Sequence, residues 1–144
     1  MNKVRPRSAI TWFYYDRFAA AVAFYRDVLG LESVLDQEWA RVFRISRDAF
    51  VGLVDARAGK GTCRTQPENA VLLTMVVDDV PAWHRRLVAA GAPAGEIVTM
   101  DEIEIRTFFL TDPGGYRIEV QEFLNARARG IFHVAQKPGE QQAL

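Results

Sequence analysis

Apolar and polar positions follow two recurring patterns along this chain, and together they predict a repeated order of strands and helices. A run rich in aromatic residues, Ile10 to Tyr15, has the length and composition of a strand with both faces covered. In the residues after it, Phe18 to Leu29, apolar side chains recur every three or four positions, as on one face of a helix that Gly30 ends. Three strands are expected next, over residues 31–35, 39–45 and 50–54. The first part of the chain is therefore predicted to be a βαβββ unit.

The same order returns in the second half of the chain. Residues 71–77 predict a strand, and Asp78 and Asp79 carry the acceptors that cap a helix, which Gly91 ends. Three more strands are predicted over residues 96–99, 103–110 and 116–123. Because Gly30 and Gly91 hold equivalent places about sixty residues apart, the pattern indicates an internal duplication of the βαβββ unit.

The stretch between the two halves is rich in small, charged and turn-forming residues, which is typical of a linker. We therefore expect one domain over residues 1–144, with module one at about 9–55, a linker at 56–69, module two at about 70–123 and a C-terminal extension at 124–144. Within this extension, residues 125–132 suggest a short helix, and the polar residues from 136 onward suggest a frayed end.

A tight turn, Asp112-Pro113-Gly114-Gly115, separates the last two predicted strands. Pro113 presets its own φ angle, the Asp112 side chain can accept from the backbone ahead of it, and the glycines tolerate positive φ. Side chains alternate along the strand that follows, so Arg117, Glu119 and Gln121 share one face while their neighbours share the other. The turn thus predicts a hairpin whose second strand presents one carboxylate, that of Glu119.

Composition restricts the classes of partner. The 18 basic and 18 acidic residues leave no net charge, so the chain as a whole has no electrostatic footprint for nucleic acid or for an anionic membrane. No apolar run approaches the length of a membrane span, no signal-type segment opens the chain, and the single Cys63 cannot form an internal disulfide. We expect a cytoplasmic protein with neither nucleic acid nor membrane as a partner.

Three motifs stand out in the two halves of the chain: Phe24-Tyr25-Arg26-Asp27-Val28-Leu29-Gly30-Leu31, Val77-Asp78-Asp79-Val80 and the segment from Asp112 to Glu119. They resemble motifs of the vicinal oxygen chelate superfamily, the group of glyoxalases, bleomycin resistance proteins and extradiol dioxygenases. The resemblance covers roughly residues 9–123. It implies an α+β fold in which two βαβββ modules form curved mixed sheets around a cleft, with helices on the outer faces. It also implies a homodimer, because such modules often pair between chains.

The resemblance further implies His, Gln or Glu metal ligands on the first and last strands of each module. In this chain those positions fall at about Ile10, Leu72, Leu53 and Glu119, and only Glu119 carries a donor. We therefore expect no metal and no cofactor, and Glu119 becomes a candidate general acid or base. The alternative interpretation is that Arg117, or an arginine on a neighbouring strand, neutralises a leftover carboxylate.

Strand alternation predicts a ligand-binding lining as well. If Ile10 faces the cleft, Trp12 and Tyr14 face it too, and two further same-face series combine aromatic residues with arginine. The predicted ligand-binding residues are Trp12, Tyr14, Trp39, Arg41, Phe43, Arg106, Phe108 and Glu119. Such a lining suits a flat, aromatic or partly anionic organic molecule. The alternative is that these aromatics fill an ordinary core.

Three functional hypotheses follow. The leading one is a metal-independent protein that binds a small organic molecule, as the antibiotic-sequestering members of the resembled group do. The second is a lyase, isomerase or dioxygenase of glyoxalase type that uses Glu119. The third is a dimeric interaction module with a vestigial cleft. His84, His133 and Cys63 occupy a helix, the C-terminal extension and the linker, where no catalytic role is predicted for them.

Overall fold

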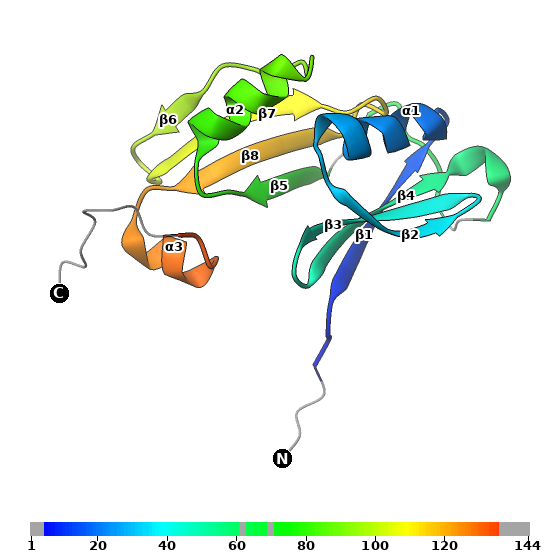
Figure 1. The fold of residues 1–144 in the computed structure, drawn as a ribbon, viewed down its shortest axis with the longest axis horizontal. Coiled ribbons are helices and arrows are strands. Elements are labelled where there is room, and N and C mark those ends of the chain that lie inside the picture. The colour runs from blue at the N-terminus through cyan, green and yellow to red at the C-terminus, as the bar shows by residue number, and fades with distance from the viewer. Residues whose placement is uncertain (1–4, 61–62, 69–70, 136–144) are drawn as a thin grey trace. The chain divides into compact units, whose positions relative to one another are not determined.

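The computed structural model describes residues 5–60, 63–68 and 71–135 of the chain (Figure 1). The chain divides into two compact units. The first comprises Met1–Asn69 together with the turn Asp112–Gly115, and the second comprises Ala70–Thr111 and Tyr116–Leu144. The predicted frayed end, from residue 136 onward, lies outside the described residues. No helix in the described ranges is long and apolar enough to cross a membrane.

The first unit is a four-stranded mixed sheet with one helical segment between its first two strands. Its strands lie in the order β1-β4-β3-β2, with β1 parallel to β4 and the other pairs antiparallel. A short α-helix packs against β4 and β1. The elements are β1 (Ala9–Tyr15), α1 (Phe18–Ala23), the π-helical turn η1 (Phe24–Val28), β2 (Glu32–Gln37), β3 (Ala40–Ser46), β4 (Ala49–Asp55) and the 3₁₀ turn η2 (Ala56–Ala58).

The second unit repeats this topology, with its strands in the order β5-β8-β7-β6 and β5 parallel to β8. Its helix α2 packs against β7 and β8. The elements are β5 (Leu72–Val76), α2 (Val80–Ala89), β6 (Val98–Met100), β7 (Ile105–Thr111), β8 (Arg117–Phe123) and α3 (Ala126–Ile131). The predicted α+β fold with two βαβββ units and mixed sheets is confirmed.

Local chemistry explains where the second-unit elements begin and end. The Asp79 side chain accepts a hydrogen bond from the Ala82 backbone N–H at 3.0 Å, so one of the two predicted capping residues does cap α2. Asn125 caps α3 in the same way, by accepting from the Ala128 N–H at 2.8 Å. Strand β7 begins at Ile105, two residues later than predicted, because residues 101–104 form a turn in which Glu104 has a φ of 54°.

Two predictions about the first unit need refinement. The predicted helix over 18–29 is present, but it is α-helical only to Ala23 and then widens into a π-turn, in which the Leu29 N–H donates to the Phe24 carbonyl. Strand β1 is covered on both faces only over Phe13 to Tyr15, since the residues from Ala9 to Trp12 are exposed. It is also an edge strand, which pairs with β4 alone.

Candidate functional site

Glu119 lies on β8 and is held by a hydroxyl from each neighbouring strand. Its Oε2 accepts a hydrogen bond from Thr74 Oγ1 of β5 at 2.8 Å, and its Oε1 accepts one from Thr107 Oγ1 of β7 at 2.9 Å. The side chain is only 8% exposed. Since a buried carboxylate is costly unless its oxygens find donors, the two threonines stabilise this one directly.

The Thr107 hydroxyl faces two acceptors but has a single proton to donate. Its Oγ1 lies 2.9 Å from Glu119 Oε1 and 3.1 Å from the Val120 carbonyl oxygen. While Glu119 is ionised, Thr107 donates to the carboxylate. When Glu119 is protonated, it can donate to the Thr107 oxygen, and the hydroxyl then turns to Val120. The site therefore accommodates both protonation states of Glu119.

No arginine neutralises Glu119 within the described ranges, so that interpretation is wrong. The Arg117 guanidinium lies over the Phe109 ring, 5.0 Å from its centroid, and Arg106 pairs with Glu122 at 2.9 Å. The ion pairs among described residues do not include Glu119. Glu119 thus relies on neutral hydroxyl donors.

The sheet face that carries Glu119, called here the Glu119 face, is otherwise mostly apolar. The register pairs Glu119 with Thr74 on one side and with Phe109 on the other. Alternation then places on this face the residues Leu72, Thr74, Val76, Val98, Met100, Ile105, Thr107, Phe109, Thr111, Arg117, Glu119, Gln121 and Phe123. Leu72, Val98 and Met100 are 49%, 50% and 44% exposed. Among these residues Glu119 is the one carboxylate.

Trp12 and Gly52 occupy the equivalent positions in the first unit. Trp12 precedes the start of its helix by the same number of residues as Thr74, and it pairs with Gly52 as Thr74 pairs with Glu119. A Cβ added to Gly52 would lie 2.2 Å from Trp12 Cε3, so the indole lies directly against this glycine. Where the second unit has a carboxylate, the first has no side chain and an indole in its place.

The chain matches the family model described as Glyoxalase/Bleomycin resistance protein/Dioxygenase superfamily over residues 9–120. It belongs to this superfamily. The resemblance drawn from the three sequence motifs is therefore confirmed.

Solved structures of superfamily proteins share the fold. A lactoylglutathione lyase from Agrobacterium tumefaciens is 27% identical, with a TM-score of 0.62 over 78% of this chain and 90% of that one. A glyoxalase/bleomycin resistance protein/dioxygenase from Nocardioides is 17% identical, with a TM-score of 0.70 over 98% and 93%. A glyoxalase/bleomycin resistance protein from Catenulispora acidiphila is 24% identical, with a TM-score of 0.62 over 80% and 96%. A search of curated proteins gave no significant match.

The residues of this superfamily member do not fit a metal ion at the positions that its resemblance implies. Ile10 and Leu72 are aliphatic, and the register corrects the predicted Leu53 to Gly52, which has no side chain. Leu53 itself is fully buried, because it lies on the opposite face of its sheet from Gly52. Nor do the described residues bring together three or more His, Cys, Asp or Glu that could hold a metal.

Two members of the predicted ligand lining lie on the wrong face of the second sheet. Arg106 and Phe108 alternate with Thr107, so they point away from the Glu119 face. Phe108 is completely buried, and the His84 ring of α2 contacts it edge-on at 4.9 Å between centroids. The prediction groups these residues with Glu119 because the sequence alone does not show which residues pair between neighbouring strands.

The first-unit members of that lining are also divided between faces. Trp12, 40% exposed, and the buried Tyr14 share a face with Gly52. Phe43 lies on the other face, with its ring centroid 6.0 Å from that of Tyr25, and Arg41 on the same side pairs with Asp36 at 2.9 Å. Trp39, half-buried, precedes β3. The structure therefore does not assemble the predicted set into one lining.

A buried cluster that the sequence did not predict lies in the first unit. Tyr15 and Tyr25 both donate their hydroxyls to Asp112 Oδ2, at 2.5 Å and 3.0 Å. Asp112 Oδ1 accepts from the Gly114 N–H at 2.9 Å, which confirms the predicted forward bond of the turn. Burial, followed by the neighbouring Tyr25 and Asp112, raises the pKa of Tyr15 above its ordinary value. The tyrosines lie 97 and 87 residues from Asp112, so no local signal could reveal the cluster.

Proposed function

We propose that this superfamily member binds a small organic molecule on the Glu119 face of its second unit, without a metal ion. The observation that carries the proposal is the Glu119 carboxylate, 8% exposed and held by two neutral hydroxyls rather than by an arginine of the described chain. An ionised carboxylate oxygen can accept more than one hydrogen bond, so each oxygen keeps capacity for a donor from a ligand.

The surroundings of Glu119 indicate the chemistry of that ligand. Leu72, Val98 and Met100 expose apolar surface for a flat body, and an N–H or O–H group would donate to the carboxylate. Arg117, exposed on the same face, has no ion-pair partner within the described ranges and would receive an anionic group. We therefore still propose an aromatic or partly anionic ligand, but Arg117, in place of Arg41 and Arg106, would bind its anionic group.

Metal independence is supported by the lack of side-chain donors at Ile10, Gly52 and Leu72. Elemental analysis of protein purified without chelator tests it, and a substoichiometric content of transition metals is the expected result. One tightly held metal ion per chain would contradict the proposal.

Ligand binding is tested with a panel of phenols and aromatic amines, followed by amide chemical shifts. Binding on the Glu119 face should move the amides of Thr74 and Thr107. Glu119→Gln should weaken the affinity by about tenfold or more, as expected for losing a hydrogen bond to a charged group. Glu38→Gln is the matched control, because Glu38 is exposed in the turn between β2 and β3. A flat response across the panel, or equal affinities for both variants, would contradict the proposal.

A second candidate function is acid/base catalysis by Glu119. It is favoured by the Thr107 hydroxyl, which can support Glu119 with or without a proton, and by the likeness to a lactoylglutathione lyase at 27% identity. The test is turnover of lactoylglutathione by the wild type and by Glu119→Gln. Turnover by the wild type that Glu119→Gln loses would support catalysis by Glu119. No turnover by the wild type would contradict this second candidate function.

We also propose a homodimer. The exposed Leu72, Val98 and Met100 would suit contact with a second copy as well as with a ligand. Light scattering at micromolar concentration should give the dimer mass, and a monomer mass would contradict this. A dimer that binds nothing from the panel would favour the third hypothesis, an interaction module.

A further inference from the structure

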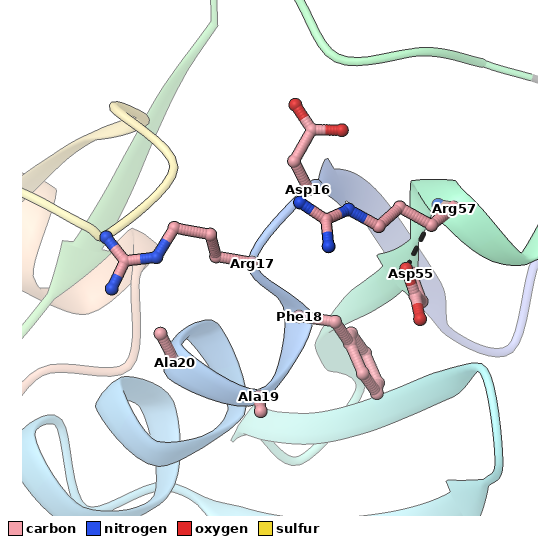
Figure 2. A pocket seen from close by; sticks show the side chains of 7 residues that line it. All are labelled: Asp16, Arg17, Phe18, Ala19, Ala20, Asp55 and Arg57. Atoms are coloured by element: carbon pink, nitrogen blue, oxygen red, sulfur yellow. Dashed lines mark hydrogen bonds between the residues drawn. The ribbon is translucent and has the colours of Figure 1, made fainter.

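A hollow of about 460 Å³ opens in the first unit, at the ends of β1 and β4 (Figure 2). It is lined by Asp16, Arg17, Phe18, Ala19, Ala20, Asp55 and Arg57. None of these residues belongs to the Glu119 face, which lies in the other unit. Its volume falls within the range of about 300–1,000 Å³ that is usual for small-molecule sites.

The parallel pairing of β1 and β4 creates this hollow. Tyr15 pairs with Asp55, the last residue of β4, so the two parallel strands have their carboxyl ends side by side. Asp55 then caps the 3₁₀ turn η2 by accepting from the Arg57 N–H at 3.0 Å, which fixes the start of the Arg57 side chain. In Figure 2, Arg57 reaches toward Asp16, and Arg17 extends on the other side of the chain.

In the hollow, the two aspartates accept hydrogen bonds from the protein, whereas the two arginine side chains donate none within the described ranges. Asp16 Oδ2 accepts from Thr65 Oγ1 at 3.1 Å, and Asp55 Oδ1 is used in the cap. The guanidinium groups of Arg17 and Arg57, both exposed, make no hydrogen bond or ion pair within the described ranges. The open capacity therefore comprises the positively charged N–H donors of both arginines and one carboxylate oxygen each of Asp16 and Asp55.

An apolar wall lies beside these donors. Phe18 is half-buried, and its ring lines the hollow together with the methyl groups of Ala19 and Ala20. Arg17 also lines a neighbouring hollow of about 390 Å³, shared with Tyr14 and Thr65. The two guanidinium groups next to this apolar wall match a ligand with an anionic end and an apolar body.

We propose that this hollow is a second binding site, and that its ligand is a small organic carboxylate. The planar guanidinium of Arg57 or Arg17 would bind the carboxylate with two parallel N–H···O bonds, and the body of the ligand would lie against Phe18. The carboxylates of Asp16 and Asp55 face the same hollow and oppose an anion, so the affinity depends on the balance between these charges.

Benzoate and its neutral analogue benzamide test this directly on the full chain. Benzoate should shift the amides of Phe18, Ala19, Ala20 and Arg57 in a saturable way, and benzamide should bind about tenfold more weakly or worse. Because the charges in the hollow have opposite signs, Arg57→Gln should weaken benzoate binding by about tenfold, whereas Asp16→Asn should strengthen it severalfold.

Arg47→Gln is the matched control, because the Arg47 side chain is 93% exposed in the turn between β3 and β4. It should leave benzoate binding unchanged. The double variant Arg17→Gln/Arg57→Gln should lose the response while keeping a native spectrum, since both side chains are exposed.

Three results would overturn the proposal. The first is equal binding of benzoate and benzamide, and the second is shifts confined to residues outside the hollow. The third is an acidic peptide that binds at Arg17 and Arg57 when benzoate does not, since this would make the hollow a protein contact. Glu119→Gln should leave benzoate binding at the hollow intact, so failure here is distinguishable from failure of the proposed function.

Discussion

Trp12 lies against the backbone of Gly52 so closely that a Cβ on this glycine would come within 2.2 Å of Trp12 Cε3. Gly52 is the first-unit counterpart of Glu119, as the parallel strand pairs of the two sheets show. At this position of the duplicated fold, the second unit therefore carries a carboxylate, whereas in the first unit an indole lies against a glycine.

Gly52→Ala should destabilise the protein by about 1–3 kcal/mol, because the added methyl group displaces the Trp12 ring. The free energy of unfolding in urea measures the loss, and tryptophan fluorescence should report a changed environment. Trp12→Ala/Gly52→Ala should cost less than the sum of the two single changes, since the methyl group then meets no ring. Additive costs would contradict the close contact.

Replacing Thr107 by Val should destabilise the second unit by about 1–3 kcal/mol, because one buried oxygen of Glu119 loses its donor. Thr74→Val removes the donor of the other oxygen and should cost a similar amount. Adding Glu119→Leu to the two threonine changes should recover part of the stability, since no buried acceptor then remains unsatisfied. The free energy of unfolding in urea is measured for the two single threonine variants, the double threonine variant and the triple variant. A triple variant no more stable than the double variant would contradict the account.

Arg129→Met should cost about 3–5 kcal/mol, because it breaks a buried charge network and leaves Glu122 without one of its arginines. Arg129 and Glu122 are 1% and 0% exposed, and Arg129 donates to the carbonyls of Phe123 and Ala135. The matched control is Arg44→Met, whose pair with Glu32 is exposed and should contribute under about 1 kcal/mol. Similar costs at both sites would contradict this difference.

The Tyr15 hydroxyl should make the stability of the first unit fall at alkaline pH. Its pKa is raised by folding, so the neutral form is the one that the native state favours. This contribution is fully present below the ordinary tyrosine pKa of 10.0 and is lost as the pH rises toward the raised value. The expected slope is up to about 1.4 kcal/mol per pH unit.

Urea unfolding between about pH 8 and pH 11 measures this slope, with Tyr15→Phe as the comparison. The phenylalanine variant should be less stable at neutral pH, because Asp112 loses a donor, and its stability should fall less steeply above about pH 10. Parallel curves for wild type and variant would exclude Tyr15 as the source of the alkaline loss.

The periodicity of the sequence was sufficient to predict both βαβββ units, because strand and helix patterns, helix caps and turn glycines are local properties. Phe18 to Leu29 shows the limit, since nothing in its apolar spacing distinguishes an α-helix from one that widens into a π-turn. The exposed first half of β1 shows a second limit, because the burial of a strand depends on which distant residues pack against it.

The candidate site was predictable only in part. Glu119 stood out as a lone carboxylate in a recognisable motif, but its partners Thr74 and Thr107 come from two other strands. Arg106 and Phe108 were grouped with it because alternation was applied within each strand, whereas their face depends on the register between strands. Asp16, Arg17, Asp55 and Arg57 meet only through the parallel pairing of β1 with β4.

The central claim is that Glu119 contacts a ligand without a metal. Its most direct test is calorimetric titration of a phenol or aromatic amine found in the panel, in buffer containing a chelator, into the wild type, Glu119→Gln and Glu38→Gln. We predict saturable binding to the wild type and Glu38→Gln, and binding weakened by about tenfold or more in Glu119→Gln. Binding that vanishes with the chelator, or that Glu119→Gln leaves unchanged, would contradict the claim.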